Sequence, residues 1–113
     1  MIDALIAGIR KASNDPVAVK LVKLFEEWKS DDSTVTDLER NIEKYIGNTW
    51  LASEQEHIDI YLLWSKFKEK EISNIKGMTM NERLFTFGLF ERFEKISSET
   101  GKHDIYTKLH AKP

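Results

Sequence analysis

Apolar side chains recur at helical spacing along most of the chain, and this periodicity constrains the fold more than any other feature of the sequence. The first repeat ends at Ser13, and Asp15 followed by Pro16 is a typical helix start, because proline loses no hydrogen bond at the first helical position. A second repeat then keeps one apolar face as far as Trp28 and gives way to the polar residues 29–33. These patterns predict two successive helices, the second of them amphipathic and packed on a core.

Three pairs of residues with capping-box spacing mark the starts of further helices. The first of these helices begins near Thr34 or Thr36, and Gly47 is expected to end it in the left-handed conformation. The second is predicted to be long, running from residue 53 to about residue 75, and the third to occupy residues 80–97. The pairs are Thr36 with Glu39, Ser53 with Glu56, and Thr79 with Glu82.

Residues 77–93 read GMTMNERLFTFGLFERF and contain four phenylalanines. On a continuous helix the apolar side chains of residues 80–97 fall on two sides, which is typical of a central helix with neighbours on both faces. Gly88 inside such a helix indicates the close approach of another helix. We therefore expect Leu84 and Phe87 to be buried, and the alternative is that part of this aromatic surface faces a partner. The two sides are Met80, Leu84, Phe87 and Phe90, and Phe85, Leu89, Phe93 and Ile96.

The remaining pattern indicates an all-α protein. A short helix is expected around residues 104–110, and no alternating strand pattern is present in the sequence. The length of 113 residues suits a single domain, which we expect to be a bundle of five to six helices around residues 80–97. The absence of cysteine, of a secretion signal and of an apolar stretch approaching the ~20 residues of a membrane span leads us to expect a cytoplasmic protein that binds no membrane.

Charge is distributed unevenly along the chain. Residues 26–59 hold ten acidic and three basic side chains, whereas the whole chain has a net charge of only −2. Basic residues elsewhere mostly alternate with acidic ones, so the sequence lacks the basic stripe that a nucleic-acid-binding protein needs. A solvated helix surface is the more usual origin of such an acidic segment, but a basic protein partner would be attracted to it.

Residues that could support catalysis or metal binding are few. Glu54 and His57 have the Glu-x-x-His spacing of di-iron helical bundles, but such a site requires a second copy, which the sequence lacks. His57 is therefore expected to be a hydrogen-bonded residue at the core boundary. His103 and His110 are too sparse for a zinc site, and no phosphate-binding glycine loop or nucleophile motif is present. We expect no enzyme activity, no metal and no cofactor.

Four segments together resemble a group of small bacterial proteins that are found beside polymorphic toxins. The segments are DPVAVKLVKLFEEWK, EKYIGNTW, YLLWSKF and GMTMNERLFTFGLFERF, which lie within residues 15–97. The most specific part is NERLFTFGLFERF, which is similar to the N-E-R-L-F/Y-x-x-G-L-F/M segment of that group. Its members are immunity proteins of contact-dependent growth inhibition and related interbacterial toxin systems. Because the matching residues are mainly capping and packing residues, the resemblance implies the fold more strongly than a binding site.

The resemblance implies a cytoplasmic immunity protein that binds a cognate toxin and blocks its active or substrate-binding surface. If that toxin is a nuclease, its basic surface would complement the acidic segment, and an aromatic residue would supply affinity. The alternatives are a regulatory or adaptor module without a toxin partner, and a metal- or ligand-binding enzyme that uses Glu54 and His57. The candidate partner-binding residues are Glu26, Glu27, Asp31, Asp32, Asp37, Glu39, Glu43, Trp50, Glu54, Glu56 and Asp59.

Overall fold

The computed structural model describes residues 1–112, which contain seven α-helices and no strand. The helices are α1 (Ile2–Ala12), α2 (Pro16–Ser30), α3 (Val35–Asn48), α4 (Glu54–Phe67), α5 (Met80–Thr86), α6 (Phe90–Glu94) and α7 (Glu99–Lys108), with a π-helical turn at Lys68–Ile72 and a 3₁₀ turn at Ile75–Gly77. The predicted all-α class is confirmed. The expected number of five to six helices is too low, because residues 80–97 do not form one helix.

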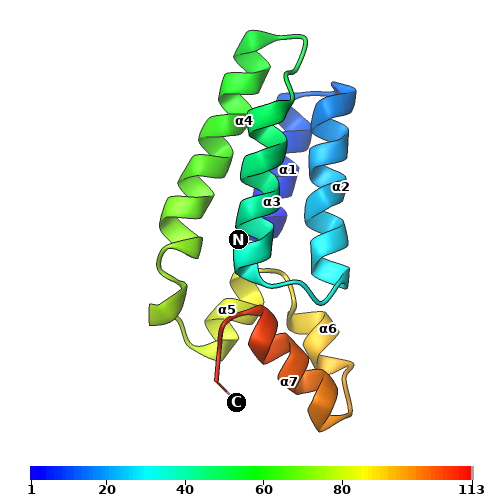
Figure 1. Ribbon diagram of the computed structural model, residues 1–113, viewed down its shortest axis with the longest axis vertical. Helices are drawn as coiled ribbons and strands as arrows, with labels where there is room; N and C mark the ends of the chain where they lie inside the picture. Colours follow the sequence, from blue (N-terminus) through cyan, green and yellow to red (C-terminus); the bar gives the residue numbers. More distant parts are fainter. Residues whose placement is uncertain (113) are drawn as a thin grey trace.

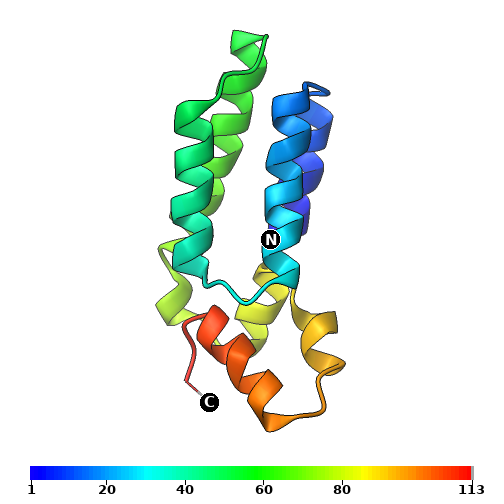
Figure 2. The same ribbon diagram turned by 45° about the vertical axis from the view of Figure 1, so that its right-hand side comes forward.

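The four long helices α1 to α4 run side by side along the long axis of the molecule (Figures 1 and 2). The molecule measures 46 × 24 × 22 Å. Helix α1 packs against α2 and α4, and α2 also packs against α3. The three short helices α5, α6 and α7 gather at one end of this bundle, whereas the connection between α3 and α4 lies at the opposite end (Figure 1). The two ends of the bundle are therefore built from different elements.

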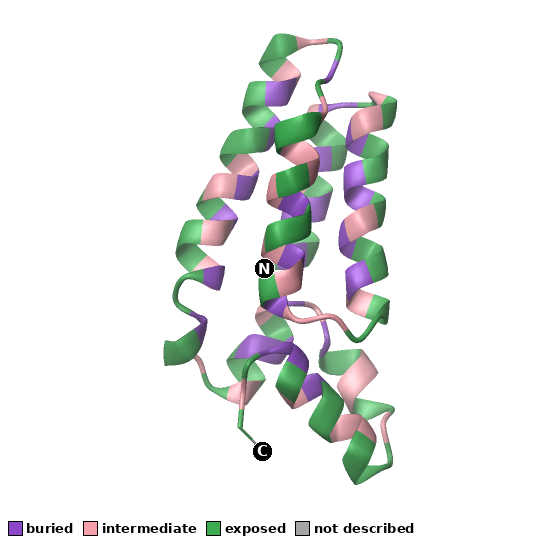
Figure 3. Cartoon of the chain, viewed as in Figure 1, coloured by how far each residue is buried: buried purple, intermediate pink, exposed green. Residues whose placement is uncertain are grey.

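One hydrophobic core joins the bundle to the short helices. Buried residues face the interior of the four long helices and continue into α5 and α7 (Figure 3). Phe87 is fully buried at the junction, where its ring meets Trp28 and Phe67 with centroid distances of 5.9 Å in both cases. Leu84 is buried beside it at 1% exposure, so the expected burial of both residues is confirmed.

Helix caps account for most of the helix starts. Asp15 accepts a hydrogen bond from the backbone N–H of Val17, and Thr79 with Glu82 forms the predicted capping box. Ser53 accepts from the N–H of Glu56, which is the first half of the expected box. The pairing of Thr36 with Glu39 is wrong, because Thr34 caps α3 and forms its box with Asp37.

Two predicted helix ends also differ from the structure. Gly47 lies within α3, which continues to Asn48, so this glycine does not end the helix in a left-handed conformation. The long helix expected up to residue 75 ends as α-helix at Phe67 and continues in the π-helical turn. A π-turn keeps the chain coiled with one extra residue per hydrogen-bonded ring, which the apolar periodicity does not reveal.

The predicted helix over residues 80–97 is interrupted at Gly88, which has a φ of +67°. Glycine adopts this left-handed conformation without a Cβ clash, so α5 ends and α6 starts in a new direction. The expected close approach is present as well, since a Cβ at Gly88 would lie 2.9 Å from Cε of Lys29 and 3.1 Å from Cγ2 of Ile2. The expectation of two buried faces is wrong, because Phe85 and Phe90 are exposed to solvent.

Candidate functional site

The structure separates the candidate partner-binding residues into two groups. One group lies around the turn between α2 and α3, at or near the end of the bundle that carries the short helices, and consists of Glu26, Glu27, Asp31, Asp32, Asp37 and Glu39. The other lies along the second half of α3, the α3–α4 connection and the first half of α4, and consists of Glu43, Trp50, Glu54, Glu56 and Asp59. These residues do not form one acidic surface.

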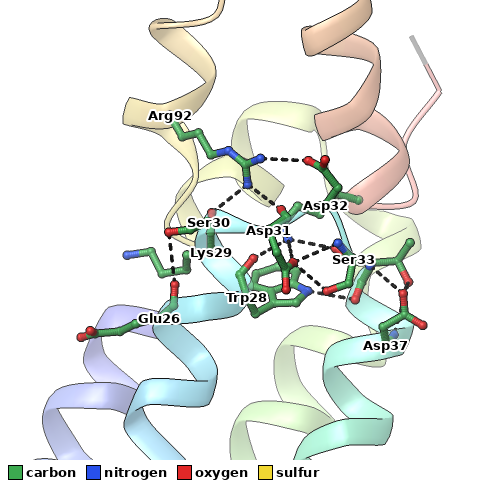
Figure 4. A network of polar contacts seen from close by, with 11 residues as sticks. Glu26, Trp28, Lys29, Ser30, Asp31, Asp32, Ser33, Asp37 and Arg92 are labelled. Atoms are coloured by element: carbon green, nitrogen blue, oxygen red, sulfur yellow. Dashed lines mark hydrogen bonds and ion pairs between the residues drawn. The ribbon is translucent and has the colours of Figure 1, made fainter.

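Arg92 of α6 holds the turn between α2 and α3 (Figure 4). Its Nη1 donates hydrogen bonds of 2.8 Å to the carbonyl oxygens of both Lys29 and Asp31. Its Nη2 lies 3.1 Å from Oδ1 of Asp32 and forms an ion pair with it. Asp31 and Asp32 therefore connect the bundle to the short helices within the molecule.

Lys108 of α7 makes a second connection to the same turn, although its side chain is fully buried. Its ammonium donates to the carbonyl oxygens of Trp28, Asp31 and Ser33 and to Oδ1 of Asp31, the last at 3.0 Å. The nitrogen also lies 4.0 Å from the ring centroid of Trp28, as in a cation–π contact. Burial lowers the pKa of Lys108, and the hydrogen bond and negative charge of Asp31 oppose this shift.

Sequence reasoning missed the roles of Arg92 and Lys108. Lys108 lies three residues after Ile105 and directly before Leu109, so it occupies the buried face of its helix. That spacing is the signal that could have indicated a buried lysine. Charge reversal at Asp31 would place two positive charges together, because this carboxylate pairs with the buried ammonium of Lys108.

Ion pairs reduce the negative charge that residues 26–59 present to a partner. Five of their ten carboxylates are paired: Asp31 and Asp32 as described, Glu26 with Arg10 at 2.7 Å, Asp37 with Arg40 at 3.6 Å, and Glu43 with Lys68 at 2.6 Å. Four of the five bases come from outside this segment. Free carboxylates are therefore confined to smaller acidic areas and do not extend over the whole acidic segment.

A groove opens between the end of α3 and the start of α4, with a volume of about 410 Å³. Three of the candidate residues line it, namely Glu43, Trp50 and Glu54, and so do His57, Ile58 and Tyr61 of α4. Its size falls within the ~300–1,000 Å³ of many ligand pockets, and neither lysine nor arginine lines it. We call this feature the Trp50 groove.

Trp50 is the most exposed large apolar residue of the described chain, at 71% exposure. One face of its indole stacks on the imidazole of His57, with a centroid distance of 4.3 Å and an interplanar angle of 26°. The backbone around it is held in place, since Ala52 N–H donates to Asp15 and the hydroxyl of Thr49 donates to the carbonyl of Tyr45. Trp50 thus presents its other face to solvent from a fixed connection.

His57 is only 9% exposed, and its Nδ1 has no hydrogen-bond partner among the described residues. The expectation that this histidine is fully hydrogen-bonded is wrong, because Trp50 covers the ring without offering Nδ1 a donor or an acceptor. A buried polar atom without a partner costs about 1–3 kcal/mol. Such an atom is an exception to the rule that buried polar groups are hydrogen-bonded.

The charge around the Trp50 groove is negative. In the part of the chain that the structure describes, Glu54 and Glu56 form no ion pair, and Glu43 carries the only paired carboxylate of the lining. The hydrogen bond from Lys68 lowers the pKa of Glu43, so this carboxylate remains ionised. The carbonyl end of α3 adds partial negative charge, and no basic side chain occupies its last turn. The groove therefore favours a cationic group.

Other chemistry finds little support in residues 1–112. Glu54 and His57 line the same groove, but no cluster of three or more potential metal ligands occurs among the described residues. Within that range no helix is both long and apolar enough to cross a bilayer. No protein-family model, curated protein or solved structure matches the chain.

Proposed function

We propose that this protein is an immunity protein, which binds a cognate interbacterial toxin domain in the cytoplasm and neutralises it. The Trp50 groove is the centre of the proposed toxin-binding surface, and it is the observation that carries the proposal. The resemblance of NERLFTFGLFERF to toxin-neighbouring immunity proteins supports the same function. This segment packs at the other end of the bundle, so it supports the scaffold and leaves the groove free to differ between relatives.

Trp50 has the properties of a residue that anchors a protein interface. Tryptophan is enriched among the few residues that supply most of the binding energy, particularly in pockets from which water is excluded. The stack on His57 orders the indole before binding, which lowers the entropy cost of association. Ile58, Tyr61 and Leu62 are exposed nearby on α4 and extend the apolar contact area.

The unpaired carboxylates favour a basic partner such as a nuclease toxin. A nuclease binds phosphates through lysine and arginine, so its substrate-binding surface is positively charged. Glu54 lines the groove on the first turn of α4, Glu56 lies on the same turn, and Asp59 follows one turn later. Binding there would cover the toxin's substrate-binding surface and stop its activity, without catalysis, metal or cofactor on this chain.

The test is co-expression with the toxin domain encoded in the adjacent reading frame. We expect co-purification of a one-to-one complex and restored growth of cells that produce the toxin. Trp50→Ala should weaken the complex by about 2 kcal/mol or more, which is roughly thirtyfold. Phe85→Ala is the matched control, because Phe85 is 62% exposed at the opposite end of the molecule. Absence of any complex with the toxin would favour the adaptor alternative.

A further inference from the structure

We propose that the partner inserts the side chain of one arginine into the Trp50 groove. The guanidinium donates hydrogen bonds to the carboxylate of Glu54 and to Nδ1 of His57, while the arginine stem packs against Trp50. This inference rests on the proposed binding of a basic protein, and it names the chemical group that the groove recognises.

The first of the two proposed polar contacts is made at His57. Its Nδ1 is buried beside the groove and lacks a partner in the described chain, so the free protein carries the cost of an unmade hydrogen bond. A donor from the binding partner that reaches the edge of the imidazole, where Nδ1 lies, removes that cost while Trp50 stays stacked on the face of the ring.

Glu54 determines the charge of the occupant. Its carboxylate lines the groove three residues before His57, on the same side of α4, and forms no ion pair with the described residues. Glu43 on the facing helix is already paired with Lys68, and the lining contains neither lysine nor arginine. A buried partner group must therefore be positively charged to leave Glu54 compensated.

The shape of the site distinguishes arginine from lysine. Arginine has five N–H donors in a planar fork and can bond two separate acceptors at once, whereas lysine carries all its donors on one nitrogen. The apolar walls formed by Ile46 and Ile58 suit the methylene stem.

The experiment titrates the whole protein with N-acetyl-arginine amide and follows the indole N–H signal of Trp50 and the ring signals of His57 by NMR. Saturable shifts of both residues are expected with the arginine compound. Binding should be at least about fivefold weaker for N-acetyl-lysine amide, and absent for N-acetyl-citrulline amide, which has a similar shape without the charge. Because no toxin is involved, this result is independent of whether the toxin complex forms.

Three variants assign the contacts. Glu54→Gln should weaken binding of the arginine compound about tenfold, and Glu94→Gln, an exposed carboxylate of α6, should leave it unchanged. His57→Phe keeps an aromatic ring beneath Trp50 but removes Nδ1, and it should weaken binding severalfold. Equal binding of the lysine compound, unchanged binding by His57→Phe, or the lack of a saturable shift at Trp50 would each overturn the inference.

Discussion

Lys108 places an ammonium group in the interior of the protein, where three backbone carbonyls and one carboxylate surround it. These acceptors stabilise the buried positive charge, and the ammonium in turn gives the carbonyl groups of the turn between α2 and α3 a hydrogen-bond donor. Burial would by itself raise the pKa of Asp31, but hydrogen bonds from Ser33 and Lys108 lower it below its ordinary value. Lys108 thus acts as a cross-link between α7 and the bundle.

Lys108→Met tests this role. The methionine fits a buried position but leaves the carbonyls and Asp31 without their donor, so the free energy of unfolding should fall by about 3 kcal/mol. Lys95→Met is the control, because Lys95 is exposed and its only ion pair within residues 1–112 is with Glu91 at 3.4 Å; its effect should stay below about 0.5 kcal/mol. Urea denaturation followed by circular dichroism measures both. Similar stability of the two variants would show that the buried ammonium contributes nothing.

Two glycines show how element boundaries depend on conformation rather than on residue type. Gly88 has a positive φ and separates α5 from α6, whereas Gly47 lies inside α3 with open space around its Cα. In the sequence both residues follow an apolar helical repeat. The pattern is therefore compatible with a helix end or with a helix interior at either glycine. The difference arises at Gly88, where Leu89 is fully buried and the chain must turn toward α1 and α2.

The two glycines should therefore respond to alanine in opposite ways. Gly88→Ala should destabilise the protein by about 1–2 kcal/mol, because alanine is strained at positive φ and its Cβ displaces Lys29. Gly47→Ala should stabilise it by up to about 0.5–1 kcal/mol, because alanine favours the helix and meets no neighbouring atom there. Thermal and urea unfolding of both variants measure the difference. Stabilisation by Gly88→Ala would contradict the left-handed turn.

At the scale of the whole molecule, the two ends of the bundle use their acidic residues differently. Around the turn between α2 and α3, carboxylates are paired with bases from α6 and α7 (Figure 4) and hold the short helices in place. At the α3–α4 end, Glu54 lines the groove with the exposed Trp50, and neither Glu54 nor Glu56 forms an ion pair with another described residue. A partner that is attracted by charge is therefore expected to approach the α3–α4 end.

Removing the negative charges of Glu54 and Glu56 tests whether the partner approaches the α3–α4 end. The double variant Glu54→Gln and Glu56→Gln should keep the helical circular dichroism spectrum and slow association with the toxin by about threefold or more at low salt. The difference from the wild type should shrink at high salt, because the Debye length falls to ~3 Å at 1 M. The double variant Glu94→Gln and Glu99→Gln removes the same charge at the other end and should associate at the wild-type rate. Equal slowing by both variants would place the interface elsewhere.

Local patterns were sufficient for much of the fold. Apolar spacing and capping residues depend on side chains three or four positions apart, so the all-α class, the starts of α2 and α5 and the burial of Leu84 and Phe87 follow from the sequence alone. The same patterns could not reveal the break at Gly88 or the π-turn after Phe67. Both depend on how the chain meets other helices.

The candidate site divides in the same way. Trp50, Glu43 and Glu54 were identified from residue type and local charge, and the structure brings them to one groove. The sequence does not indicate that Trp50 covers His57, or that Arg10, Lys68, Arg92 and Lys108 pair with four of the ten carboxylates of residues 26–59. These contacts join residues far apart in the chain. Only tertiary packing decides which charges are paired and which polar atoms are left without a partner, because both depend on distance in space.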